Sequence, residues 1–104
     1  MRNLIIHPQA QSEITDAYKW YRIRSQALGY DFLRETNKSI YAVTKLPLHY
    51  PMIEENIRRI KLYKFPYNLY FALETPASNK EEIIILACLH ERRDPKLWQE
   101  RQNQ

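Results

Sequence analysis

The sequence predicts an α+β protein in which an N-terminal helical hairpin packs on one face of a small, antiparallel-rich, four-stranded sheet. Apolar residues with helical spacing occupy the first half of the chain, alternating apolar residues occupy the second half, and prolines fall where the two patterns meet. The predicted order is strand, helix, helix and three strands, with a possible short C-terminal helix. A chain of 104 residues suffices for one core, so we expect a single domain over residues 1–104.

The N-terminal elements are a short strand and a first helix. The strand is predicted over residues 2–6, because Pro8 ends it and suits the first turn of a helix. The helix then presents a stripe of Ala10, Ile14, Ala17 and Tyr21. Tyr18 and Trp20 flank this stripe and widen the apolar arc to about 160°. Such an arc fits either a wide core or a surface that binds a partner.

The second helix is predicted to follow a break near Gly29 and to end at Pro47. Its inward stripe consists of Phe32, Thr36, Ser39, Ile40, Val43 and Leu46. Residues 47–51 carry two prolines and predict a stiff connector, in which His49 is a turn residue. The two helices should therefore be antiparallel neighbours.

Three strands are predicted in the second half, over about residues 57–64, 67–73 and 83–89. Alternation on the first places Arg59, Lys61 and Tyr63 on one face and Arg58, Ile60 and Leu62 on the other. The last strand is apolar on both faces, with Ile83, Ile85, Ala87 and Leu89 opposite Ile84, Leu86 and Cys88. It therefore suits a central position in the sheet. Asp94 and Pro95 resemble the start of a further short helix.

Composition disfavours several classes of function. A single glycine disfavours a Walker loop or a dinucleotide-binding loop, so we expect no nucleotide or other small-molecule cofactor. The histidines His7, His49 and His90 are scattered, so we expect no metal site. The lone Cys88 cannot form an internal disulfide, and no apolar run reaches membrane-spanning length. We therefore expect a soluble, cytoplasmic protein without a membrane partner.

Basic residues are unevenly placed. The net charge is only +4, but residues 58–64 carry four cations and no acid. A second basic group consists of Arg92, Arg93, Lys96 and Arg101. Such a patch fits a phosphate, a nucleic acid or an acidic protein segment, while a solvated strand face is the alternative for the first strand.

The order of these features resembles the RelE/ParE superfamily of toxins from type II toxin-antitoxin systems, most closely the ParE, or plasmid-stabilisation, branch. The resemblance spans almost the whole chain. It is carried jointly by Pro8, the aromatic first helix, Gly29 with Phe32, the connector 47–51, the Ile57-Arg58-Arg59-Ile60 run, the Phe65-Pro66-Tyr67 turn and the segment 90–98. It implies a growth-inhibiting toxin that is neutralised by a cognate antitoxin.

The two branches of the superfamily differ in their targets. The resemblance implies that RelE-like members cut mRNA on the ribosome without a metal, whereas ParE-like members poison DNA gyrase. Arg59, Lys61 and Arg92 match basic positions of the nuclease branch, but Asn68 replaces an arginine and Trp98 replaces a tyrosine. An indole can stack, yet it cannot exchange a proton at a useful pH. These departures favour a toxin that binds its target without cutting it.

We therefore expect a non-enzymatic toxin with DNA gyrase as the target implied by the resemblance. Its expected target-binding residues are Arg59, Lys61, Arg92, Arg93, Trp98 and Arg101. Trp20 and Tyr18 are the expected antitoxin-binding residues. The alternative is a ribosome-dependent mRNA endonuclease with His90, Arg92 and Lys61 as catalytic residues, where His90 otherwise has a structural role. An inactive module that only pairs with an antitoxin remains a third alternative.

Overall fold

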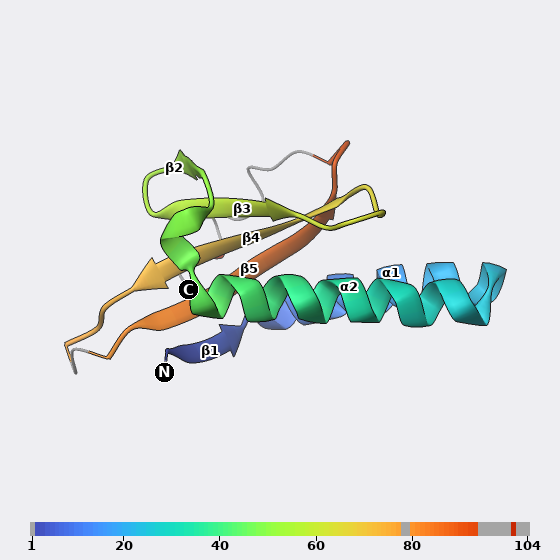
Figure 1. The fold of residues 1–104 in the computed structure, drawn as a ribbon, viewed down its shortest axis with the longest axis horizontal. Helices are drawn as coiled ribbons and strands as arrows, with labels where there is room; N and C mark the ends of the chain where they lie inside the picture. Colours follow the sequence, from blue (N-terminus) through green and yellow to red (C-terminus); the bar gives the residue numbers. More distant parts are fainter. Residues whose placement is uncertain (1, 78–79, 94–100, 102–104) are drawn as a thin grey trace.

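A computed structural model of the chain describes residues 2–77, 80–93 and 101. Its elements are β1 (Asn3–Ile6), α1 (Pro8–Arg24), α2 (Gln26–Lys45), the 3-10 helix η1 (Pro47–His49), β2 (Met52–Glu54), β3 (Ile57–Lys61), β4 (Tyr67–Glu74) and β5 (Glu82–His90). The strands form one sheet in the order β1-β5-β4-β3-β2, in which only the β1–β5 pairing is parallel. The two helices lie side by side along one face of this sheet (Figure 1). The α+β prediction is confirmed.

The described sheet has five strands instead of the predicted four. The additional strand is β2, whose three residues are all exposed and pair with β3 through a register shift. A strand this short and exposed carries no alternating apolar pattern, so the sequence gives no signal for it. The predicted C-terminal helix falls on residues 94–100 and 102–104, outside the described residues, although Arg101 itself is helical.

The hairpin forms from the two predicted stripes. Pro8 stands in the first turn of α1, and the His7 ring caps this helix by accepting a hydrogen bond from the Gln9 N–H. Ala10, Ile14 and Ala17 are buried in α1, and Phe32, Thr36, Ser39, Ile40 and Val43 are buried in α2. Leu46, by contrast, is the C-cap of α2 and is 64% exposed, so its assignment to the inward stripe is wrong.

Gly29 does not break the chain, as the sequence suggested. The break occurs at Ser25, which caps α2 with its hydroxyl, and Gly29 is buried inside α2. A Cβ atom at this position would lie 3.0 Å from Cβ and 3.1 Å from Cα of Arg22 in α1. The glycine therefore allows the two helices to approach closely.

Two apolar clusters lie on opposite faces of the sheet. The larger joins the helices to Leu69 and Phe71 of β4 and to Ile83, Ile85 and Cys88 of β5. The second consists of Ile57, Tyr70, Ala72, Leu86, Ala87 and Leu89. All of these side chains are buried, so both faces of the two central strands lie within apolar packing. This confirms the expectation that β5 is covered on both sides.

Strict alternation along β5 fails at Leu86. Tyr70 pairs with Ala87 and the next residue, Phe71, pairs with Ile85, so Leu86 is an extra residue of β5. A β-bulge of this kind reverses the side-chain pattern beyond it. Cys88 therefore faces the helices, and Ala87 and Leu89 face away, the reverse of the predicted assignment.

The close approach at Gly29 predicts that a larger residue destabilises the fold. Alanine should raise helix propensity by about 1 kcal/mol at an unconstrained position. In Gly29→Ala, overpacking against the Arg22 backbone should cancel this gain. In Gly29→Val the overpacking should exceed the gain, so the free energy of unfolding should fall by about 1–3 kcal/mol. Urea unfolding measures both, with the exposed position Asn37→Ala as a propensity control. A full 1 kcal/mol gain for Gly29→Ala would contradict this account.

Candidate functional site

Two basic side chains of β3 project from the sheet face that points away from the helices. Arg59 pairs with Tyr70 and Lys61 pairs with Asn68, and residues paired across two strands share a face. Tyr70 belongs to the apolar cluster on the side without helices. Arg59 and Lys61 are both exposed. The predicted alternation is therefore confirmed for Arg59 and Lys61, which lie beside Asn68 and Tyr70 of β4. The predicted strand over residues 57–64 is too long, because β3 ends at Lys61 and the turn that follows, with its positive φ at Lys64, includes Tyr63.

Lys61 is joined to the end of β5 by an ion pair. Its Nζ lies 3.1 Å from Oε2 of Glu91, and the hydrogen bond with Lys61 lowers the pKa of this carboxyl. Both side chains are largely exposed, so the pair adds little to stability. Its effect is on charge, since Glu91 offsets one cation in a region that also contains the exposed Arg92 and Arg93.

His90 lies on the other side of the sheet. It pairs with Tyr67, whose ring packs with the helix-side cluster, and the two ring centroids are 5.3 Å apart. Its Nδ1 accepts a hydrogen bond from the Arg92 N–H at 3.2 Å. His90 and Lys61 therefore project from opposite faces of the sheet, although Lys61, His90 and Arg92 all lie near Glu91, whose pKa is lowered by the charge of each.

A pocket of about 250 Å³ lies between α1 and the end of β5. It is lined by Glu13, Asp16, Ala17, Trp20, Tyr67, Cys88, Leu89, His90 and Arg93. Trp20 is 50% exposed, and the Arg24 guanidinium lies 3.2 Å from the centroid of its ring. Tyr18 is only half-buried and has Arg22 above its ring. The two residues expected to bind an antitoxin are thus both accessible on α1.

Arg101, which the sequence placed among the target-binding residues, is buried. Its side chain is 8% exposed and forms a two-pronged ion pair with Glu13, with Nη1–Oε1 and Nη2–Oε2 distances of 2.9 and 2.8 Å. Sequence reasoning missed Glu13. The signal was present, because Glu13 follows Ala10 by three positions and precedes Ala17 by four, so it borders the buried stripe of α1.

Trp98, the remaining expected target-binding residue, lies outside the described residues. Among the residues that are described, no group of three or more His, Cys, Asp or Glu side chains could hold a metal ion. No helix in the described part of the chain is long and apolar enough to cross a membrane.

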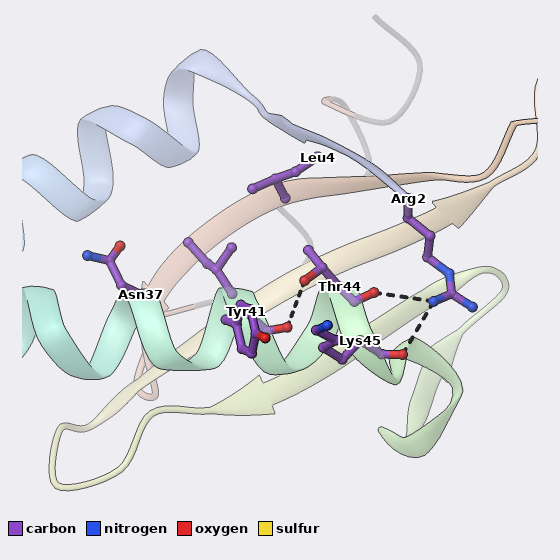
Figure 2. A pocket seen from close by; sticks show the side chains of 7 residues that line it. Arg2, Leu4, Asn37, Tyr41, Thr44 and Lys45 are labelled. Carbon is purple, nitrogen blue, oxygen red and sulfur yellow. Dashed lines mark hydrogen bonds between the residues drawn. The ribbon is translucent and has the colours of Figure 1, made fainter.

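A larger groove of about 630 Å³ lies between β1 and α2, and Leu4, Asn37 and Tyr41 are among the residues that line it (Figure 2). Arg2 closes one end of it, because its Nη1 donates to the carbonyl oxygens of Thr44 and Lys45 at 3.2 and 3.3 Å. These are among the last carbonyls of α2, so Arg2 caps that helix. Its Nε also lies 3.4 Å from the Glu81 carboxylate. This end of the groove is thus a structural junction between β1, α2 and the start of β5.

Comparison with known proteins gives a structural likeness only. No protein-family model matches the chain, and no curated protein matches its sequence. The fold is similar to that of a chain in the solved structure described as "Chromosomal ParDE TA system from P. aeruginosa", with a TM-score of 0.71 and 15% sequence identity. The match covers 86% of this chain and 96% of that chain. The chain therefore has the fold that its sequence resemblance implied.

Cys88 should make stability fall at alkaline pH. Burial raises the pKa of this thiol, and the negative charge of Glu13 adds a smaller increase, so that the pKa rises from 9.0 to about 12. The stabilising effect of the neutral thiol is complete below about pH 9 and is lost as pH rises toward 12, because the unfolded chain releases the proton first. By pH 10 the loss should be on the order of 1 kcal/mol.

Urea unfolding between pH 8 and pH 11 measures this loss, and Cys88→Val is the matched variant without a titrating group. Burial also raises the pKa of Tyr21 and Tyr67, so some decline should persist in the variant. Identical slopes of unfolding free energy against pH in the two proteins would show that Cys88 contributes nothing.

Proposed function

We propose that this protein is a ParE-like toxin of a type II toxin-antitoxin system, which inhibits growth in the cytoplasm and is neutralised by a cognate antitoxin. The observation that carries the proposal is the shared fold, which extends over 96% of a chain from a ParDE TA system. The order of sequence motifs supports the same conclusion independently of the structure. A role in plasmid stabilisation would follow from this activity.

The proposed target is DNA gyrase, bound through exposed basic residues of β3 and of the segment that follows β5. Arg59, Lys61, Arg92 and Arg93 are exposed there, and Trp98 is proposed to add an aromatic contact. The burial of Arg101 argues for a supporting role for that residue. Trp20 and Tyr18, both on α1, are proposed to contact the antitoxin.

A binding mechanism without catalysis has specific support. Metal-free RNA cleavage needs an acid and a base close to cations that stabilise the developing charge. His90 is turned toward α1 and hydrogen-bonded to the backbone of Arg92, whereas Lys61 projects from the other face. Asn68, which pairs with Lys61, is 8% exposed and adds no charge.

Controlled expression in a bacterial host tests the proposal. Growth should stop, an SOS reporter should rise, and purified protein should inhibit DNA supercoiling by gyrase. Co-expression of a small antitoxin from the neighbouring reading frame should restore growth. Loss of mRNA with ribosome-dependent cuts, mapped by primer extension and without SOS induction, would instead establish the nuclease alternative.

Substitutions at the end of β5 should separate binding from catalysis. Arg92→Ala should weaken gyrase binding because it removes an exposed cation, whereas His90→Gln should leave toxicity largely intact because no proton transfer is involved. Arg34→Ala is the matched control, since Arg34 is exposed on α2 and pairs with Asp31. A folded His90→Gln variant with a loss of a hundredfold or more in activity would contradict the binding mechanism.

Trp98 should act as a binding hot spot. Trp98→Phe should retain most of the affinity because an aromatic ring still fills the contact, whereas Trp98→Ala should cost about 2 kcal/mol, or roughly 30-fold in Kd. Titration of gyrase with each variant measures the two constants, and circular dichroism checks the fold. Equal affinities for the three proteins would remove Trp98 from the proposed contact surface.

A further inference from the structure

The edge of β5 changes its partner halfway along the strand. β1 pairs with β5 from Glu82 to Ile85, and the last contact is the hydrogen bond from the His7 N–H to the Ile85 carbonyl at 2.9 Å. The chain then turns into α1 at Pro8. Beyond this point the backbone of β5 still presents polar groups along the same edge, and buried backbone groups require partners.

Two of these backbone groups are bound by side chains. The Cys88 N–H donates to Oε1 of Glu13 at 3.0 Å, and Nη1 of Arg101 donates to the Leu86 carbonyl at 2.9 Å. The carboxylate of Glu13 thus takes the acceptor role that a backbone carbonyl of a neighbouring strand would have. The guanidinium of Arg101 takes the donor role that a backbone amide of that strand would have. The two side chains also bind each other in the two-pronged ion pair described above.

We propose that Glu13 and Arg101 form a clasp that replaces a strand at the open edge of β5 and positions the basic residues at the end of that strand. The clasp joins three parts of the chain: α1, the bulged half of β5, and Arg101. The polarity of each side chain matches the backbone group that it binds. Neither residue is proposed to touch the target.

Burial makes the clasp an all-or-none arrangement. Arg101 is 8% exposed and Glu13 is 20% exposed. Removing either one leaves the other as a poorly solvated charge and also frees a backbone group of β5. Loss of one partner should therefore open the edge locally, even where the rest of the domain stays folded.

Cys88 reports on this opening. It is the only cysteine of the chain, its side chain is 1% exposed, and its own N–H is held by Glu13. The rate at which a thiol reagent labels Cys88 under native conditions therefore measures how often this part of β5 opens. Arg101→Gln and Glu13→Ala should each raise the labelling rate at least about tenfold.

A core variant separates local from global opening. Val43 is fully buried in α2, so Val43→Ala lowers global stability without touching the clasp. Urea unfolding identifies conditions in which Val43→Ala and Arg101→Gln have equal stability. Faster labelling of Arg101→Gln under those conditions supports the clasp, whereas equal labelling overturns it.

Exchanging the two charges tests whether the backbone contacts matter. The double variant Glu13→Arg, Arg101→Glu retains an ion pair, but it points a donor at the Cys88 N–H and an acceptor at the Leu86 carbonyl. Labelling of Cys88, and hydrogen exchange of its amide, should therefore remain fast. Recovery of wild-type rates would show a simple ion pair and would overturn the strand-replacing role.

The positioning of the basic residues rests on the proposed function and has its own measurement. Arg101→Gln should weaken gyrase binding under conditions in which the variant is folded, and Arg101→Lys should recover part of that loss. Unchanged gyrase binding in a variant with fast Cys88 labelling would overturn the positioning role. If the wild-type protein does not bind gyrase, the proposed function fails, but the labelling experiments still decide whether the clasp exists.

Discussion

A strand in the middle of a sheet must satisfy two faces and two edges at once, and most of this structure follows from how β5 does so. Its faces are buried in two apolar clusters. One edge pairs with β4 along the strand, and the other pairs with β1 only as far as Ile85. The backbone of the remaining half of that edge is bound by side chains instead. Glu13 reaches it from α1, and Arg101 binds it from the C-terminal part of the chain.

The helical hairpin could be predicted from sequence because one repeating pattern specifies it. The spacing of Ala10, Ile14 and Ala17, and the prolines before and after the helices, depend only on nearby residues. Gly29 could not be interpreted correctly in the same way. From the sequence alone a glycine indicates a break in a helix, and its role in close packing becomes visible only when the facing helix is known. The exposed strand β2 is too short to carry an alternating apolar pattern.

The candidate site was predictable to a similar extent. Alternation correctly placed Arg59 and Lys61 together on one face of β3, because strand geometry alone determines that. It could not place Arg101, whose partner Glu13 lies 88 positions away in the sequence. It also could not separate His90 from Lys61, since that separation depends on the pairing of three strands. Under the proposed function, a partner bound only at Trp20 would leave Arg59 on the far face uncovered.

The bulge at Leu86 also affects how this chain should be aligned with its structural relatives. β5 has one residue more than the stretch of β4 that it pairs with, so an alignment without a gap to a relative that lacks this bulge is displaced by one position from Leu86 onward. Such a displacement would exchange inward-facing and outward-facing residues up to His90 and would shift the basic segment that follows. Roles transferred from such a relative to Arg92 or Arg93 therefore require a superposition of strands that counts this extra residue.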